Sequence, residues 1–124
     1  MSGPKRTLGD AGERLAERRV GELGWSVIDR KWRVRGGEID LIALDGDVLV
    51  FIEVKTRRGA ARGAAEEAID DAKSERLLML GEQYVSNHPE HLDKVWRVDL
   101  IAITVGPSGS VQRVSHLRNV CSTG

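Results

Sequence analysis

The sequence contains a single cysteine, Cys121, among its 124 residues. One cysteine excludes an internal disulfide and a zinc site built from several cysteines, and it is typical of a reducing compartment. The sequence therefore predicts a cytoplasmic protein. Because Cys121 stands near the C-terminus, we expect it in a loose tail spanning residues 119–124, with a similar tail at residues 1–7.

Long apolar runs are also missing. No stretch approaches the ~20 apolar residues that a membrane helix needs, and the basic start of the chain is not followed by the apolar segment of a signal peptide. Association with a membrane is therefore not expected. The length fits one compact domain, and a hydrophobic content of 40% is enough for a core.

The chain lacks an excess of either charge, since Lys and Arg together number 19 and Asp and Glu together number 19. A net charge of zero argues against nucleic-acid binding through bulk positive charge. It leaves room for basic residues that gather locally, so the positions of the charges matter more than their sum.

Hydrophobic periodicity predicts two helices and five strands in the order α-β-β-β-α-β-β. This pattern is typical of an α/β fold in which helices flank a mixed sheet. The long second helix can carry the chain across the sheet, which would make the fourth strand parallel to a central one. The expected segments are Leu8–Leu23, Trp25–Val34, Glu38–Leu44, Val48–Thr56, Ala64–Val85, Trp96–Val105 and Val111–Leu117.

Acidic residues interrupt two of these strands, within the segment Gly37–Arg57. Side chains alternate between the faces of a strand, so Glu38 and Asp40 share one face, and Glu53 and Lys55 share a face of the next strand. An Asp-Gly pair between the two apolar runs predicts a tight hairpin. The strands are then neighbours, and the carboxylates of Asp40 and Glu53 can converge.

Converging carboxylates repel each other unless a proton or a cation neutralises them. Mg²⁺ or Mn²⁺ suits such a site, with Asp40, Glu53 and the backbone carbonyl of Val54 as ligands. The ammonium of Lys55 can orient a water molecule or stabilise charge on a phosphoryl oxygen. The trio of Asp40, Glu53 and Lys55 is therefore a candidate catalytic site for metal-assisted hydrolysis of phosphodiesters.

Each candidate residue also has a structural interpretation. A Glu-x-Lys pair on a strand is often a solvated charge pair, but here it breaks an apolar run beside a second acid. Glu13 and Glu38 are further candidate metal ligands. Glu13 lies beside the apolar stripe of the first helix, where it reaches either the sheet edge or a neighbouring arginine.

Basic residues flank the acidic strands and are candidates for phosphate contacts. The alternative for each is a solvated face or, for the helical lysine, a long side chain that covers apolar surface. We expect Asp99 to pair with Arg97 and the three histidines to lie at the surface. The candidate nucleic-acid-binding residues are Arg33, Arg35, Arg57, Arg58 and Lys73.

The segments GEIDLIA (37–43) and FIEVKTR (51–57) resemble the YraN-like family of small bacterial proteins of unassigned function. That family is similar to restriction-endonuclease-like folds and, within them, to archaeal Holliday-junction resolvases. The resemblance covers nearly the whole chain. It extends to Gly12-Glu13, Lys73, Arg97–Asp99 and His116–Asn119.

The resemblance implies a site of the PD-(D/E)xK type. Asp40 matches the first metal acid, Glu53 the second and Lys55 the lysine, while Glu13 matches the helical glutamate of the resolvases. Ile39 replaces the proline of the motif. The implied function is a Mg²⁺- or Mn²⁺-dependent endonuclease that acts on DNA rather than RNA, including branched DNA.

Two alternatives remain open. The first is a nucleic-acid-binding or interaction module with the same fold and little or no turnover. The second is a protein-binding partner in DNA processing whose acidic site is structural. The small size and neutral charge favour a module that works as a homodimer or with a protein partner.

Overall fold

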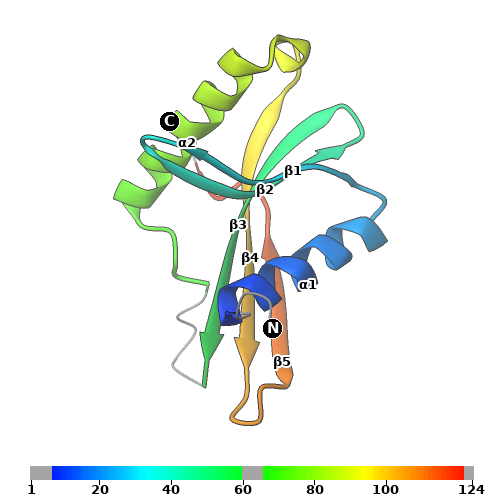
Figure 1. Ribbon diagram of the computed structural model, residues 1–124, viewed down its shortest axis with the longest axis vertical. Helices are drawn as coiled ribbons and strands as arrows, with labels where there is room; N and C mark the ends of the chain where they lie inside the picture. Colours follow the sequence, from blue (N-terminus) through cyan, green and yellow to red (C-terminus); the bar gives the residue numbers. More distant parts are fainter. Residues whose placement is uncertain (1–6, 60–65, 122–124) are drawn as a thin grey trace, which may run out of the picture.

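The computed structural model describes residues 7–59 and 66–121 (Figure 1). The helices and strands follow the predicted order, which is confirmed, with one short 3₁₀ helix added before the fourth strand. The elements are α1 (Leu8–Glu22), β1 (Ser26–Val34), β2 (Gly37–Asp45), β3 (Val48–Arg58), α2 (Asp71–Asn87), η1 (Pro89–His91), β4 (Trp96–Val105) and β5 (Val111–Leu117).

The second helix begins later than predicted. It starts at Asp71, and the side chain of Asp70 caps it by accepting the backbone N–H of Lys73 at 2.8 Å. An aspartate that satisfies a free N–H of the first turn marks a helix start, and it competes with helix formation upstream. The predicted start at Ala64 lies outside the described residues, but residues 66–70 are not helical.

The five strands form one sheet in the order β1-β2-β3-β4-β5. Strands β3 and β4 are parallel, as predicted, and the other neighbours are antiparallel. A two-residue turn joins β2 to β3, with Asp45 paired to Val48. Gly46 in that turn has a φ of +60°, which glycine adopts without strain.

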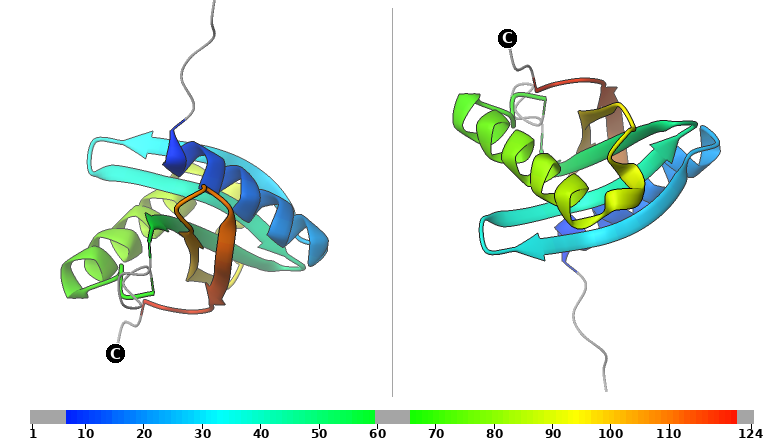
Figure 2. Two further views of the ribbon diagram at one scale, coloured as in Figure 1. Left: turned by 90° about the horizontal axis from the view of Figure 1, so that it is seen from below. Right: turned by 90° about the horizontal axis from the view of Figure 1, so that it is seen from above.

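The two helices cover opposite faces of the sheet (Figures 1 and 2). Along β3, Val50 and Ile52 belong to the core beneath α1, whereas Leu49 and Phe51 belong to the core beneath α2. All four are fully buried. A central strand covered on both faces explains why VLVFI is a continuous apolar run.

Strict alternation fails in the first half of β2. Ile39 packs in the core beneath α2, and Leu41 packs in the core beneath α1, although regular alternation would place both side chains on one face. The β2–β3 ladder ends at the pair Leu41–Ile52, while β2 remains paired with β1 as far as Gly37. The β1–β2 hairpin therefore turns away from β3, and the two strands separate at Asp40.

The prediction of a loose tail from residue 119 is wrong for residues 119–121. Cys121 is buried in the core beneath α2, and the N–H of Val120 donates to the carbonyl of Val98 at 2.8 Å. The reason is that Val120 and Cys121 complete the cover of β4. At the other end, Thr7 caps α1. Residues 1–6 and 122–124 lie outside the described residues.

No helix in the described parts of the chain is long and apolar enough to cross a membrane.

Candidate metal site

Asp40 lies at the point where β2 and β3 separate. Beyond Ile52, β3 has no backbone partner on its β2 side, so the N–H of Val54 needs another acceptor. The Asp40 carboxylate supplies it, with Oδ2 at 2.8 Å from the Val54 nitrogen. The sheet's own divergence thus fixes Asp40 across from the Glu53–Lys55 segment.

Two further carboxylates join Asp40. Glu13 from α1 and Glu38 from β2 each place a carboxylate oxygen so that all three groups lie within 4.8 Å of one another. All three side chains are half-buried. The fold therefore brings the predicted accessory ligands Glu13 and Glu38 into one close group with Asp40.

Gly12 allows α1 to lie close enough for this arrangement. A Cβ at that position would stand 1.9 Å from Oγ1 and 3.2 Å from Cβ of Thr56 on β3. Only a residue without a side chain fits there. The glycine therefore lets the helix pack on β3 and presents the next residue, Glu13, to Asp40.

Burial and the neighbouring acids raise the pKa of Asp40. Burial is the largest cause, followed by the negative charge of Glu53; Glu13 and Glu38 add smaller contributions. The hydrogen bond from Val54 acts in the opposite direction but is outweighed, and the pKa of Asp40 rises to about 8. At neutral pH this carboxyl group therefore holds a proton unless a cation takes its place.

Each of the other acids has its own cation. Lys31 Nζ lies 3.0 Å from Glu13 Oε1 and Lys73 Nζ lies 2.9 Å from Glu53 Oε2, while Arg33 forms an ion pair with Glu38. The cations come from three places, namely two positions on β1 and one on α2. Lys73 thus forms an ion pair with one of the predicted acids of the site.

Glu53 and Lys55 lie on β3 as predicted, on either side of Val54. The Glu53 side chain is only 12% exposed and faces α2, where Lys73 holds it. Its charge reaches Asp40, but its carboxylate is not part of the close group of three. Lys55 is half-buried, and no ion pair joins it to another residue within 7–59 or 66–121.

The other candidate basic residues, which lie in the described parts of the chain, form no ion pair with the acids of the site. Arg35 is exposed in the turn between β1 and β2, and Arg57 and Arg58 are exposed at the end of β3.

The donor set fits a hard divalent cation. Carboxylate oxygens are the preferred ligands of Mg²⁺, and two oxygens on opposite sides of that ion are about 4.2 Å apart, twice the ligand distance of about 2.1 Å. The group of Glu13, Glu38 and Asp40 is slightly wider, within 4.8 Å, so small side-chain movements would bring the oxygens to that spacing.

The profile of a known family matches residues 12–103, a range that includes Gly12, Glu13, Asp40 and the Glu53–Lys55 segment. That family is described as "Uncharacterised protein family UPF0102". The chain belongs to this family. The resemblance to YraN-like proteins, read from the two strand motifs, is thereby confirmed.

UPF0102 proteins from several bacteria align with nearly the whole chain. The relative from Roseiflexus castenholzii is 42% identical over 118 residues, covering 94% of each chain. The relative from Kineococcus radiotolerans is 44% identical over 116 residues, again covering 94% of each. Among solved structures, Pyrococcus furiosus SfsA in complex with Ca²⁺ is similar at a TM-score of 0.39 and 16% identity, covering 89% of this chain and 62% of that one. A likeness at that score carries no argument about the site.

A second ionic cluster in this UPF0102 chain surrounds Asp99, which is fully buried on β4. Arg97 Nε donates to its carboxylate at 2.9 Å, so the predicted Arg97 partner is confirmed. His116 Nε2 also lies 2.9 Å from it, and the N–H of Asn119 donates at 3.0 Å. The prediction that the histidines lie at the surface is wrong, since His91 is buried and His88 and His116 are half-buried.

Proposed function

We propose that this chain is a Mg²⁺- or Mn²⁺-dependent endonuclease that hydrolyses phosphodiester bonds of DNA, branched DNA included. The observation that carries the proposal is the close group of Glu13, Glu38 and Asp40, together with an Asp40 pKa of about 8. A group of carboxylates that keeps a proton to limit its own repulsion can bind a cation in place of that proton. The proposal includes a restriction-endonuclease-like core, a PD-(D/E)xK-type site and a cytoplasmic location.

The acids have different roles in holding the ion. Asp40 is the central ligand, because it belongs to the close group with Glu13 and Glu38 and also senses the charge of Glu53. The Val54 N–H fixes one of its oxygens and leaves the other free to bind. When bound, the ion would supply charge neutralisation and a more acidic water molecule.

The lysines act on the substrate side. The ammonium of Lys55 stabilises the charge that grows on a phosphoryl oxygen, or it orients the attacking water. Lys73 holds the Glu53 carboxylate in place through their 2.9 Å contact. Its remaining N–H donors are available for a substrate phosphate.

A panel of labelled linear, flap and four-way DNA, incubated with Mg²⁺, Mn²⁺ or EDTA, tests the proposal. Cleavage should require the divalent ion. Asp40→Ala and Glu53→Ala should abolish it, and Lys55→Met should remove most of it without loss of folding. Cleavage by Asp40→Ala at the wild-type rate would contradict the site, and so would cleavage in EDTA.

The second candidate is a nucleic-acid-binding or interaction module that does not turn over. The pairing of Glu13, Glu38 and Glu53 with cations of the same chain favours it, because those pairs satisfy the acids without a metal. Binding of DNA without cleavage of any substrate in the panel, in either metal, would favour this module.

A further inference from the structure

Several basic side chains of the described residues are neutralised inside the protein. Ion pairs join a carboxylate to each of Arg30, Lys31, Arg33, Lys73, Arg97 and Arg113. Four arginines near α1 and β5 differ from this set. Within residues 7–59 and 66–121, no ion pair involves Arg14, Arg18, Arg19 or Arg118.

The four arginines line two hollows beside α1, where β5 passes close to the helix (Figure 2). One hollow, of about 440 Å³, is lined by Arg19 and Arg118 with His116 between them. The other, of about 640 Å³, is lined by Arg14 and Arg18. We call these two hollows together the arginine groove.

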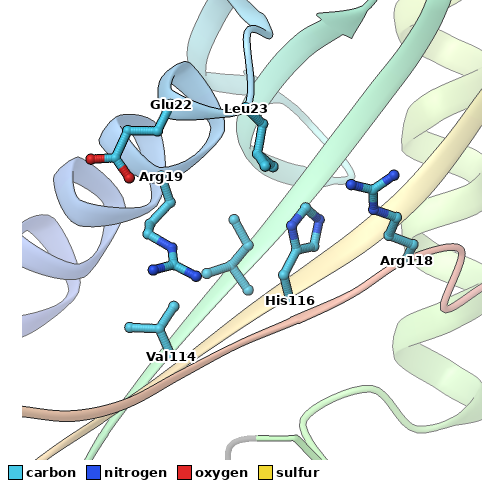
Figure 3. A pocket seen from close by; sticks show the side chains of 7 residues that line it. Arg19, Glu22, Leu23, Val114, His116 and Arg118 are labelled. Carbon is cyan, nitrogen blue, oxygen red and sulfur yellow. The ribbon is translucent and has the colours of Figure 1, made fainter.

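One wall of the arginine groove is held by the buried core. The guanidinium of Arg118 lies 5.3 Å from the centre of the Trp25 ring, a cation–π contact that limits its freedom. His116 Nε2 is fixed by Asp99 at 2.9 Å. In Figure 3 His116 and Arg118 lie on one side of the hollow, and the side chain of Arg19 extends from α1 toward Val114 on the other side.

The acids beside the groove do not cancel its charge. Glu17 lines the second hollow, but Arg30 on β1 holds its carboxylate through two hydrogen bonds. Glu22 lines the first hollow, and its carboxylate points away from His116 and Arg118 (Figure 3). The groove therefore presents guanidinium groups to any molecule that approaches it.

We propose that the arginine groove binds the phosphodiester backbone of a DNA strand. Arg14 and Arg18 stand one helical turn apart, about 6 Å along α1. A strand of B-DNA carries one phosphate per about 3.4 Å of its axis, so both arginines can reach phosphates of the same strand. Planar guanidinium groups suit phosphate oxygens. This surface rests on the proposed function for its choice of DNA, and it is separate from the basic residues predicted around the acidic site.

Fluorescence anisotropy with a labelled 20-base-pair duplex in EDTA, over a range of salt concentrations, tests the arginine groove. The variant is Arg18→Gln/Arg19→Gln, which changes exposed side chains from both hollows. The matched control is Arg76→Gln/Lys94→Gln, which removes the same charge from α2 and from the segment before β4. The groove variant should weaken binding at least tenfold and flatten the slope of log affinity against log salt by up to about 0.9 per lost phosphate contact.

The control should bind like the wild type. Equal slopes for the groove variant and the wild type would overturn the inference, as would a wild type that does not bind the duplex at low salt. Weakening by the control pair as strong as by the groove pair would also overturn it, because bulk charge would then explain binding. Cleavage assays on the same proteins separate the two proposals. A groove variant that loses binding while no protein cleaves DNA contradicts the nuclease alone, whereas cleavage with unchanged binding contradicts the groove alone.

Discussion

Two aspartates of one sheet, Asp40 on β2 and Asp99 on β4, are surrounded in opposite ways. Asp99 is completely buried, and burial by itself raises its pKa, but hydrogen bonds from His116, Arg97 and the Asn119 N–H outweigh that effect and hold the pKa below its usual value. Asp40 is less buried and receives one hydrogen bond from the protein, from Val54, while carboxylates face it on several sides.

The difference shows that burial alone does not decide the charge of a carboxyl group. Burial is the largest cause of the raised pKa of Asp40, whereas at Asp99 the hydrogen-bonding partners outweigh burial. The carboxylate of Asp99 already has its counter-charges, so its role is to hold β4 to the segment after β5. Asp40 has too few counter-charges, and a proton neutralises its carboxyl group instead. In such a comparison, the aspartate whose partners are incomplete is the candidate for binding something from outside.

The largest effect is expected at Asp99. Asp99→Ala leaves Arg97 and His116 without their shared acceptor, and loss of one partner from a buried ion pair costs about 3–5 kcal/mol. Urea denaturation would measure it. The control is Asp45→Ala, which removes a more exposed and longer contact to Arg97 at 3.4 Å and should cost under about 1 kcal/mol. Similar losses for both variants would contradict the role given to Asp99.

A smaller loss is expected from Gly12→Ala. The new Cβ would meet Thr56 Oγ1 at 1.9 Å, so α1 must move away from β3 and carry Glu13 with it. Overpacking of this kind costs about 1–3 kcal/mol. Metal affinity should fall as well. Gly21→Ala is the matched control, since no atom lies within 4 Å of the new Cβ there, and it should stabilise α1 slightly. A Gly12→Ala protein as stable as Gly21→Ala would contradict this packing.

Asp40→Asn should stabilise the metal-free protein. A carboxyl with a raised folded pKa loses stability as pH rises above its unfolded value near 3.8, and the loss is complete near its folded value of about 8. The asparagine variant escapes this loss and keeps an oxygen for the Val54 N–H. In EDTA the advantage of the variant should grow between pH 5 and pH 8 and reach about 1–2 kcal/mol, because solvent screens part of the full effect. Melting curves across that range would show it, and an advantage that does not change with pH would contradict the raised pKa.

The smallest effect is expected at Lys73. Lys73→Met removes the cation that lies 2.9 Å from Glu53, so the acidic site becomes more negative and should bind Mn²⁺ a few-fold more tightly. Calorimetric titration would measure this. Arg76→Met on the same helix removes an equal charge from an exposed side chain and should leave the affinity unchanged. Equal tightening in both variants would mean that overall charge, and not the Lys73–Glu53 contact, controls the site.

Periodicity in the sequence was enough to predict the order of the elements, because apolar residues recur at distinct spacings in helices and strands. It also identified β4 from Trp96 to Val105 and β5 from Val111 to Leu117 with their observed bounds. It did not predict the switch of faces between Ile39 and Leu41. That switch arises where β2 parts from β3, and the divergence depends on tertiary packing that no local spacing records.

The acidic residues of the site were all visible in the sequence as charges within or beside apolar segments. Their partners were not. The sequence does not indicate that Lys31 pairs with Glu13, because the two residues are far apart in the chain and only the packing of α1 on the sheet brings them together. The sequence does not indicate the contact between His116 and Asp99 either, since the two residues are 17 positions apart in the chain.

The central claim is that Asp40 belongs to a site for a divalent cation, and melting curves of the wild type and Asp40→Asn, with and without Mn²⁺, test it most directly. At a hundredfold excess over the dissociation constant, Mn²⁺ should stabilise the wild type by about 2.7 kcal/mol, a rise of about ten degrees in Tm. Asp40→Asn should melt higher than the wild type in EDTA and show no response to the ion. The account would be contradicted if millimolar Mn²⁺ left the Tm of the wild type unchanged and Asp40→Asn were less stable than the wild type.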